Sequence, residues 1–466
     1  MNIKTNSKDV KEGDIFVAIK GNTVDGHDYI DEAINNGAKL IVCEKGKYSK
    51  PTLNVDSSLE YLKEYLVSNY SKEFNDLKFI GVTGTNGKTT TAYLISEMLT
   101  ILGISNAYIG TLGYFVNNEF KEKTDNTTPD ILNLYDLILK SKNNGVKVIV
   151  MEVSSHALEF ERVKGIKFDV LAFTNLTEDH LDFHKTMDNY LKSKLKILGY
   201  LKEEGTIIVN DDDKYGMYFK QKNFKTISLE RDSDYRVADY KQIGSQTKLI
   251  INNQGRTYLA FNNLLGKFNV YNYITSIAML NSLGIDLRTL INVGSEVKAP
   301  SGRNEIINYG NNKIVIDYAH TPDAVLKIIT AAREYTKGNI YTIIGCGGDR
   351  DRKKRPIMGN YATSASNYTI FTDDNPRNED EEQIMNDILV GVKSDNYETI
   401  FSRKKAIQRG IDMLTDNDTL LILGKGHEDY EIFKGRKVHF SDREEVLNYL
   451  NRDNSLKLIQ KDYKWV

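Results

Sequence analysis

A ten-residue stretch constrains the fold of this chain more than any other feature. Residues 81–90 read Gly-Val-Thr-Gly-Thr-Asn-Gly-Lys-Thr-Thr; an apolar run at 77–82 leads into them, and apolar residues at helical spacing follow at 91–102. Strand, glycine-rich turn, Gly-Lys-Thr and helix, in this order, are typical of a phosphate-binding loop. Glycines let backbone N–H groups converge on phosphate oxygens, and the helix N-terminus adds partial positive charge. The stretch therefore predicts a nucleotide site at the end of a strand.

The side chains at the end of this loop fit the same prediction. Lys88 can span the β- and γ-phosphates of a nucleotide, and the Thr89 hydroxyl can ligate Mg²⁺. The usual pattern has a glycine where this chain has Val82, whereas here the glycines are Gly81 and Gly84. An incidental glycine-rich turn is the alternative, but the flanking strand and helix both favour a phosphate site.

Composition limits the size and class of the protein. The 466 residues suffice for three domains of usual size, and 40% apolar residues support ordinary globular cores. The formal charge of −2 gives no electrostatic reason to expect nucleic acid or an anionic membrane as a partner. Two cysteines, Cys43 and Cys346, imply no disulfide framework and no cysteine-based zinc site. Because the chain has no long apolar run and no apolar signal segment, we expect a cytoplasmic protein without membrane insertion.

Alternating strand and helix patterns predict an α/β protein of three domains, at 1–75, 76–299 and 300–466. The central domain reads as a parallel sheet of the phosphate-loop ATPase kind, and the C-terminal one as a Rossmann-like, doubly wound domain. The expected strands are 14–20, 39–43, 77–82, 146–153, 169–176, 205–210, 313–317, 340–345, 368–372 and 419–424, with weaker β structure at 230–262. The expected helices are 30–36, 59–70, 91–102 and 264–283.

Polar residues follow the central strands, which places them at the carboxyl edge of a parallel sheet, where such sheets bind ligands. Glu152 ends one strand, and His180 follows another. A carboxylate and an imidazole there could hold a divalent metal near the phosphates, and oxygen ligands suit Mg²⁺. The alternative is that His180 and Asp182 hydrogen-bond within a turn. Lys194 lies on a later helix, where a lysine is by default a surface residue.

Three loops of the C-terminal domain carry charge directly after strands. They offer Arg350, Arg377 and Glu428, and Pro376 fixes the backbone beside Arg377. An arginine held at a set angle suits bidentate binding of a carboxylate. Two cations and one anion at the same sheet edge suit a zwitterionic ligand with an additional carboxylate. A solvated charged loop is the alternative for the segment around Arg350.

Taken together, these motifs resemble the Mur ligase family, and within it the ligases that add the third residue of the peptidoglycan stem peptide. The resemblance covers nearly the whole chain. Its pieces are Gly13-Asp-Ile-Phe-Val-Ala-Ile, Asp25-Gly-His, Thr83-Gly-Thr-Asn-Gly-Lys-Thr-Thr, Thr127-Thr-Pro, Glu152-Val-Ser-Ser-His-Ala-Leu, Thr174-Asn-Leu-Thr-Glu-Asp-His-Leu-Asp, Gly302-Arg-Asn-Glu, Asp317-Tyr-Ala-His-Thr-Pro, Gly348-Asp-Arg-Asp, Asp374-Asn-Pro-Arg and Gly424-Lys-Gly-His-Glu. The family usually has Asp-Ser-Arg where this chain has Asn6-Ser7-Lys8, and some relatives have Gln where Phe160 stands.

The resemblance implies roles for residues in every domain. For ATP it implies Gly84, Thr85, Asn86, Gly87, Lys88, Thr89, Thr90, Asn269, Asn272, Arg303 and Asp317. For the UDP-MurNAc-dipeptide it implies Ser7, Asn22, Thr23, Asn126, Thr127, Thr128, Ser154 and Arg162. For the incoming amino acid it implies Arg350, Asp374, Asn375, Pro376, Arg377, Gly424 and Glu428. As Mg²⁺ ligands it implies Thr89, Glu152, His180 and Lys194, the last carbamylated to N6-carboxylysine, and as catalytic residues Lys88, His180 and Lys194.

The implied reaction is ATP-dependent amide formation by a monomeric enzyme. It joins a diamino acid to the D-glutamate of UDP-MurNAc-L-Ala-D-Glu through an acyl phosphate. Asn375-Pro376-Arg377 resembles relatives that use meso-diaminopimelate, while lanthionine and lysine stay open as substrates. The rival interpretations are a sister ligase, such as folylpolyglutamate synthetase or a ligase for another stem position, and a nucleotide switch that has lost ligation. Folate relatives usually have Gly-Lys-Gly-Ser where this chain has Gly87-Lys-Thr-Thr, and intact Glu152, His180 and Lys194 argue against a switch.

Overall fold

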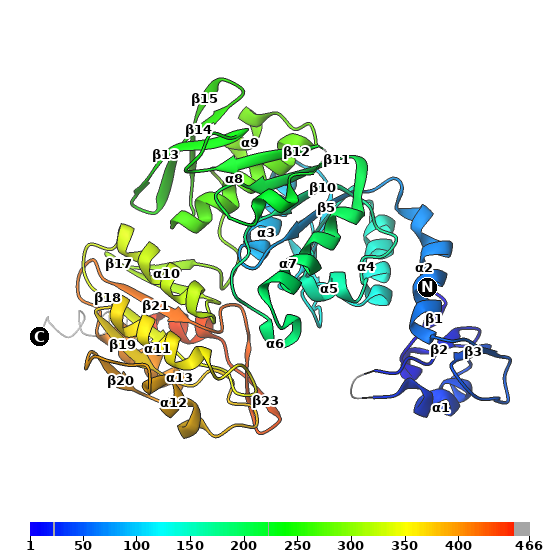
Figure 1. The fold of residues 1–466 in the computed structure, drawn as a ribbon. Helices are drawn as coiled ribbons and strands as arrows, with labels where there is room; N and C mark the ends of the chain where they lie inside the picture. The colour runs from blue at the N-terminus through cyan, green and yellow to red at the C-terminus, as the bar shows by residue number, and fades with distance from the viewer. Residues whose placement is uncertain (22–23, 222, 452–466) are drawn as a thin grey trace, which may run out of the picture.

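The protein is described by a computed structural model, which covers residues 1–21, 24–221 and 223–451. Figure 1 shows three α/β units in chain order: a small one in blue, a large one in cyan and green, and a third in yellow to red. Each unit is built on its own main β-sheet. These sheets lie within 1–75, 76–299 and 300–466 respectively, and the domain boundaries themselves stay predictions.

The first unit is a four-stranded parallel sheet in the order β1-β2-β3-β4. Its strands are β1 (Ile3–Lys4), β2 (Ile15–Val17), β3 (Leu40–Cys43) and β4 (Thr52–Asn54), and its helices are α1 (Ile30–Asn35) and α2 (Ser58–Tyr70). Helix α2 begins where the Ser57 hydroxyl accepts a hydrogen bond from the Glu60 N–H. Its Leu62 and Leu66, four residues apart, face the core shared with the central unit. The sequence predicts β2, β3, α1 and α2, but it does not predict the short edge strands β1 and β4.

The central unit contains an eleven-stranded sheet in the order β15-β14-β13-β12-β11-β10-β5-β9-β6-β7-β8. Its middle is parallel, and antiparallel hairpins extend both edges. The strands are β5 (Lys78–Thr83), β6 (Asn106–Gly110), β7 (Gly113–Val116), β8 (Glu119–Glu122), β9 (Val148–Glu152), β10 (Phe168–Phe173), β11 (Leu201–Asn210), β12 (Phe224–Ser228), β13 (Tyr235–Ile243), β14 (Gln246–Asn253) and β15 (Arg256–Asn262). The helices are α3 (Lys88–Ile101), α4 (Ile131–Asn143), α5 (Ser155–Glu159), α6 (Leu181–His184), α7 (Met187–Leu195), α8 (Lys267–Ser282) and α9 (Leu287–Val293).

The middle strands of this sheet are buried on both faces, which explains their continuous apolar runs. On one face Phe79 packs in a core with α4, α5 and α7; on the other, Ile80 packs in a core with α3 and α8. Strand β5 lies between β9 and β10, with Val82 beside Glu152 and Thr83 beside Phe173. The loops after these three strands therefore meet at one carboxyl edge, as predicted.

The third unit is a six-stranded sheet in the order β16-β17-β21-β18-β19-β20, parallel except for β16. Its strands are β16 (Glu305–Tyr309), β17 (Asn312–Asp317), β18 (Ile340–Ile344), β19 (Tyr368–Phe371), β20 (Tyr397–Thr399) and β21 (Thr419–Leu423), followed by a separate hairpin, β22 (Tyr430–Phe433) and β23 (Arg436–His439). Helices α10 (Pro322–Tyr335), α11 (Lys354–Ala365) and α12 (Glu381–Leu389) cover one face, and α13 (Arg403–Asp412) covers the other. The doubly wound α/β prediction is confirmed.

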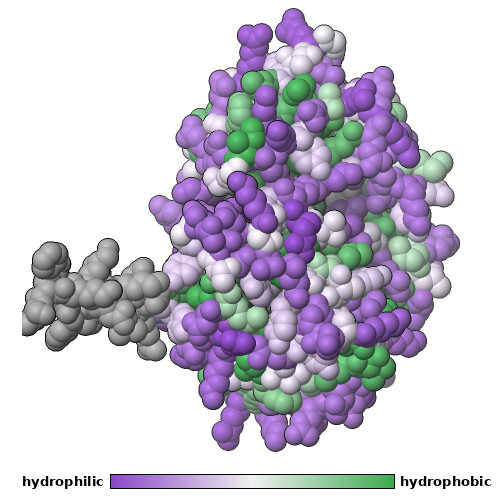
Figure 2. All heavy atoms as spheres, turned by 90° about the vertical axis from the view of Figure 1, so that its left-hand side faces the viewer, coloured by the Kyte–Doolittle hydropathy of each residue, from purple (hydrophilic) through white to green (hydrophobic). Residues whose placement is uncertain are grey.

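The surface agrees with the balanced composition. The face in Figure 2 is mostly hydrophilic, with hydrophobic residues in small separate groups. Among the described residues, every helix is too short or too polar to cross a membrane.

Candidate active site

The phosphate loop has the backbone geometry that its glycines predict. It connects β5 to α3, with positive φ at Gly84 (+147°) and Gly87 (+86°). A Cβ on Gly84 would lie 1.9 Å from the Thr174 hydroxyl, and one on Gly87 would lie 2.4 Å from the Asn272 side-chain oxygen. Only glycine fits either position. Gly87 is also the N-cap of α3 and brings no capping side chain, so the first N–H groups of the helix face the loop.

Lys88 folds back onto its own loop. Its Nζ donates to the carbonyls of Gly84 (3.0 Å) and Thr85 (2.8 Å). Burial lowers the pKa of Lys88, and the charge of Glu152 partly opposes this shift. The lysine thus lies beside the site where the sequence predicts phosphates, and a phosphate oxygen can replace these two carbonyls as its partner.

Glu152 is fully buried at the end of β9. Its Oε2 accepts from the Thr89 hydroxyl (2.8 Å) and the Thr111 hydroxyl (3.2 Å), and its Oε1 accepts from the Tyr108 hydroxyl (2.6 Å) and the Thr111 N–H (2.8 Å). Buried carboxylates need such partners. A carboxylate and a threonine hydroxyl side by side form an oxygen-rich donor set that suits Mg²⁺. Among the described residues, no three His, Cys, Asp or Glu side chains form a metal cluster.

His180 stands at the start of α6 in a left-handed conformation, with φ of +53°. Its Nε2 lies 3.4 Å from Asp179, and its ring is 5.1 Å from that of His156. Desolvation lowers the pKa of His180 to about 4, despite the opposing charge of Asp179. The imidazole is therefore neutral at neutral pH and keeps a lone pair for a metal. Within the turn, the backbone N–H of His180 donates to Asp179, and its carbonyl accepts from the N–H groups of Phe183 and His184.

Lys194 overturns the default expectation of a surface lysine. Helix α7 packs against α5, and the lysine side chain is 1% exposed. Its Nζ donates to Gly84 O over 2.7 Å and lies 4.5 Å from the centre of the Tyr190 ring. Burial, reinforced by the charge of Lys88, lowers the pKa of Lys194 far below its usual value. The structure therefore places the Lys194 amine directly behind the phosphate loop, where burial disfavours its charged form.

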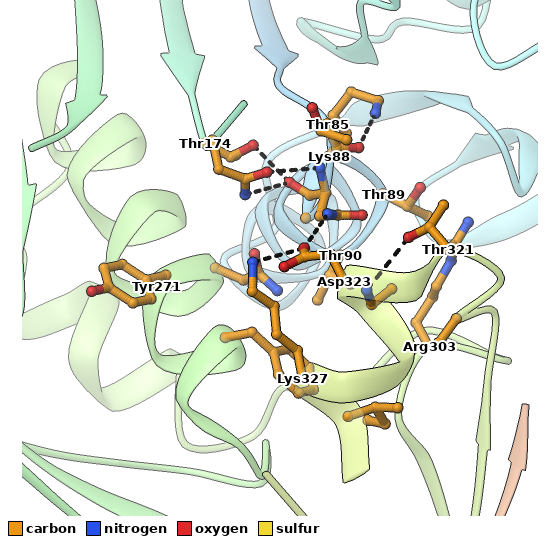
Figure 3. Close-up of a pocket in the computed structure, with 18 of the residues that line it drawn as sticks. Thr85, Lys88, Thr89, Thr90, Thr174, Tyr271, Arg303, Thr321, Asp323 and Lys327 are labelled. Carbon is orange, nitrogen blue, oxygen red and sulfur yellow. Dashed lines mark hydrogen bonds and ion pairs between the residues drawn. The ribbon is translucent and has the colours of Figure 1, made fainter. Parts of the chain in front are cut away.

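Lys88, Glu152 and His180 line one cavity of about 760 Å³ between the central and third units, whereas the predicted Lys194 does not line it. Figure 3 shows the end of β5 and the start of α3 on one side, and Arg303, Thr321, Asp323 and Lys327 of the third unit on the other. The predicted residues that line it are Thr85, Asn86, Gly87, Lys88, Thr89, Thr90, Thr127, Glu152, His180, Asn272, Arg303 and Asp317. Gly84 does not line the cavity, but its carbonyl accepts a hydrogen bond from Lys88.

Asn269 does not line the cavity; its side-chain oxygen accepts from the Asn272 amide (3.0 Å) and so orients that residue. Arg303 stacks over the Tyr318 ring at 4.4 Å. The Asp317 carboxylate accepts from the backbone N–H groups of Asn304 and Ala319.

Tyr271 and Tyr318 line the cavity but were not predicted from the sequence, although each directly adjoins a residue that was predicted.

Part of the predicted dipeptide set forms a connected group beside Glu152. The Thr128 hydroxyl donates to Glu152 O and accepts from the Ser154 N–H, and Arg162 Nη1 donates to Thr128 O over 2.8 Å. Thr127 touches Thr111 on the cavity wall. Asn126 is exposed at the surface.

The remaining members of the dipeptide set belong to the first unit. Ser7 is buried, and its hydroxyl donates to Glu32 over 2.6 Å. Asn22 and Thr23 lie outside the described residues.

The predicted amino-acid set gathers at the carboxyl edge of the third sheet. The Asn375 amide donates to Glu428 (2.9 Å), and a Cβ on Gly424 would lie 2.6 Å from the Asp374 carboxylate. Burial and the charge of Asp374 raise the pKa of Glu428. This set adjoins the cavity, because the Tyr318 hydroxyl is 3.5 Å from Glu428.

Arg377 is fixed by more than the preceding Pro376. It is left-handed, with φ of +56°; its N–H donates to Ile432 O, and its own carbonyl accepts from Lys434. The hairpin β22–β23 therefore holds its backbone. Its Nη1 donates to Gly348 O (2.7 Å), which brings it against the loop of Arg350. Arg350 itself is exposed and points its Nη1 at Asp349 O.

Comparison with known proteins agrees with this three-part arrangement. Family models match residues 1–72 ("Mur ligase family, catalytic domain"), 82–280 ("Mur ligase middle domain") and 302–426 ("Mur ligase, glutamate ligase domain"). The chain is 39% identical to a UDP-N-acetylmuramoyl-L-alanyl-D-glutamate–2,6-diaminopimelate ligase of Clostridium botulinum, over 95% of this chain and 94% of the relative. The chain belongs to the Mur ligase family. A second Mur ligase of the same name, from Fusobacterium nucleatum, is 41% identical over 95% of this chain and 92% of its own.

Solved Mur ligase structures share the fold. One titled as a UDP-N-acetylmuramoyl-L-alanyl-D-glutamate–2,6-diaminopimelate ligase superposes with a TM-score of 0.69 at 29% identity, covering 97% of this chain and 95% of that one. The MurF ligase of Thermotoga maritima, solved with ADP, superposes with a TM-score of 0.71 at 20% identity, covering 98% of both chains. The second likeness concerns the fold alone. Together they confirm the predicted Mur-type α/β architecture.

Proposed function

We propose that this Mur ligase adds the third residue of the stem peptide, meso-diaminopimelate, to the D-glutamate of UDP-MurNAc-L-Ala-D-Glu with ATP as the energy source. One observation carries the proposal. The phosphate-loop cavity adjoins, through Tyr318, the acidic and basic cluster of Asp374, Asn375, Arg377 and Glu428. A site that activates an acid thus adjoins a site that can hold an amino acid, and full-length relatives at about 40% identity carry the name of this reaction.

A carboxylate must be activated before an amine can attack it. Transfer of the γ-phosphoryl group of ATP to the D-glutamate side-chain carboxylate forms an acyl phosphate and releases ADP. The amine of the diamino acid then attacks the acyl carbon, phosphate leaves, and the amine loses a proton as the amide forms. Lys88, at the start of α3, offsets the negative charge that gathers when phosphate and carboxylate meet.

The Mg²⁺ of the family fits the donor set present. Thr89 and Oε2 of Glu152 would hold it, with His180 offering a neutral imidazole. When bound, Mg²⁺ neutralises phosphate charge. We propose that Lys194 is carbamylated: its neutral amine adds to carbon dioxide, a proton is released, and an anion replaces an amine at the phosphate loop. The burial that lowers the pKa of Lys194 supports this step, because only an unprotonated amine reacts.

Positioning is the other contribution of the protein. Thr128, Ser154 and Arg162 form a connected polar group on the central unit that would hold the dipeptide. Arg377 and Glu428 would bind the carboxylate and amino groups of the diamino acid on the third unit. Holding the amine against the acyl phosphate can contribute on the order of 7–11 kcal/mol to catalysis.

The test is an amino-acid panel with the purified enzyme, ATP and UDP-MurNAc-L-Ala-D-Glu, scored by ADP release and product mass. We expect rapid ligation of meso-diaminopimelate, slower ligation of lanthionine, and little of lysine, which lacks the distal carboxylate. Faster turnover with lysine would contradict the proposed amino acid. ADP release that needs neither acceptor nor amino acid would contradict ligation itself.

A further inference from the structure

Tyr108 is a buried tyrosine whose hydroxyl the proposed reaction leaves unexplained. It lies on β6, is 1% exposed, and its hydroxyl donates to Oε1 of Glu152 over 2.6 Å. In the parallel pair β6–β9, Tyr108 stands opposite Val150. Glu152 is two residues further along β9 and so shares the face of Val150, which lets the tyrosine reach forward to it. The ring packs edge-on against Tyr93 and Phe115 and is fixed by them.

The two oxygens of Glu152 have different partners. Oε1 is occupied by the Tyr108 hydroxyl and by the Thr111 N–H (2.8 Å). Oε2 faces the hydroxyls of Thr89 (2.8 Å) and Thr111 (3.2 Å). Thr89, Thr111 and Glu152 line the cavity, and Tyr108 does not. The tyrosine therefore holds the carboxylate from behind, and Oε2 is the oxygen beside the phosphate-loop hydroxyl.

The backbone beside Tyr108 and Glu152 leaves no room for a side chain at position 110. A Cβ on Gly110 would lie 2.3 Å from the Tyr108 hydroxyl and 2.4 Å from Oε1 of Glu152. Gly110 thus permits the close approach of the chain to the two side chains. Without the tyrosine hydroxyl, Oε1 would keep one donor only, and the buried carboxylate would be free to rotate toward the cavity.

We propose that Tyr108 is a positioning residue that makes Glu152 a one-oxygen ligand, presenting Oε2 together with Thr89 to the divalent cation. This inference rests on the proposed function only for the identity of that cation. It goes beyond it by assigning a residue outside the cavity to the affinity for Mg²⁺. Other predicted ligands, His180 and Lys194, are held by other segments and do not touch Tyr108.

The test compares Tyr108→Phe with Tyr114→Phe. Both changes remove one hydroxyl from a buried tyrosine on neighbouring strands, but the Tyr114 hydroxyl contacts Ser141 (2.9 Å) and not Glu152. Binding of a fluorescent ADP analogue is titrated with Mg²⁺ for the wild type and both variants, without turnover. We expect Tyr108→Phe to need about tenfold more Mg²⁺ for half-saturation, the size of one lost hydrogen bond to a charged group, and Tyr114→Phe to match the wild type.

Melting temperatures of the metal-free proteins separate positioning from folding. Equal Mg²⁺ half-saturation in all three proteins overturns the inference, whether or not Tyr108→Phe melts earlier. Equal losses in the two variants overturn it as well, because they would reflect packing alone. If the amino-acid panel yields no ligation while Tyr108→Phe still weakens Mg²⁺-dependent nucleotide binding, the proposed function fails and the role of Tyr108 stands.

Discussion

Lys88 and Lys194 donate hydrogen bonds to the same backbone carbonyl, that of Gly84, over 3.0 and 2.7 Å. Two protonated amines this close repel each other, and burial already disfavours charge on both. Lys194 is the more deeply enclosed of the two, and the charge of Lys88 lowers its pKa further. We therefore expect Lys88 to offset phosphate charge and Lys194 to be the site of the proposed carbamate.

Replacing Lys194 by methionine is expected to lower the rate of ligation by at least about 100-fold, because the anion of the proposed carbamate near the transferred phosphate would be lost. Turnover of the wild type should fall in bicarbonate-depleted buffer and return when bicarbonate is added. Steady-state ADP release measures both. Lys192→Met is the control, since Lys192 is exposed on the same helix and pairs with Asp188. Normal turnover of Lys194→Met at low bicarbonate would refute the carbamate.

Asp373 is expected to make the stability of the protein depend on pH. Burial and the charges of Glu381 and Glu431 raise its pKa to about 7, from an ordinary value of 3.8, and Arg403 opposes them. Between these values the folded form binds more protons than the unfolded one, so stability falls as pH rises through this window. Asp373→Asn should therefore stabilise the protein by about 1–2 kcal/mol at pH 8, after allowance for solvent screening, and by almost nothing near pH 4.

Thermal melts of the wild type and Asp373→Asn across this pH range check the prediction. The exposed Asp395, which precedes β20, offers a control, and Asp395→Asn should melt like the wild type at every pH. A gain from Asp373→Asn that is constant with pH would exclude titration of this carboxyl as the cause.

Sequence patterns predicted the elements that carry the site, because those elements are long and uniform. The strand before the phosphate loop is buried on both faces, and the helix after it is apolar over several turns. The short strand β6 was missed, since Asn106 and Gly110 at its ends read as turn residues. The edge strands β1, β4, β16 and β20 are two to five residues long and offer too few positions for a period to appear.

Roles that depend on tertiary contacts could not be predicted from local pattern. Lys194 is buried because α7 packs onto α5, and the sequence of the nine residues of α7 does not indicate that contact. Tyr108 reads as an ordinary core aromatic, because its partner Glu152 is 44 residues away. Pro376 pointed to a fixed Arg377, but the left-handed backbone and the hairpin that hold it come from pairing with residue 432.

Arg377 should determine affinity for the incoming amino acid. Its guanidinium donates to Gly348 O and Asn375 O beside Glu428. These hydrogen bonds fix the orientation in which it can bind a carboxylate. Arg377→Ala is expected to raise the KM for meso-diaminopimelate about 10- to 100-fold and to change the KM for ATP less than about twofold. Arg352→Ala is the matched control, because Arg352 is exposed and pairs with Asp387 of α12. Equal effects of Arg377→Ala on both KM values would count against the pocket assignment.

We expect the buried pair Arg403–Asp442 to link stability to the proposed amino-acid pocket. The two side chains are fully buried and joined by two hydrogen bonds of 2.7 Å. The same guanidinium donates to the carbonyls of Leu423 (3.0 Å) and Asp373 (3.3 Å), the residues directly before Gly424 and Asp374. One cation thus contacts the starts of the two loops that carry the proposed pocket residues.

Asp442→Asn keeps the size of the side chain but removes the charge that Arg403 needs. Leaving a buried cation without its partner is expected to cost about 3–5 kcal/mol of unfolding free energy. The loosened loops should also raise the KM for the diamino acid several-fold while the KM for ATP stays near the wild-type value. Denaturant unfolding and steady-state kinetics measure the two effects. Glu445→Gln, which breaks the partly exposed pair with Lys404, should change stability by less than about 1 kcal/mol and leave both KM values unchanged. A stable Asp442→Asn enzyme, or one whose two KM values rise together, would show that this pair does not hold the pocket.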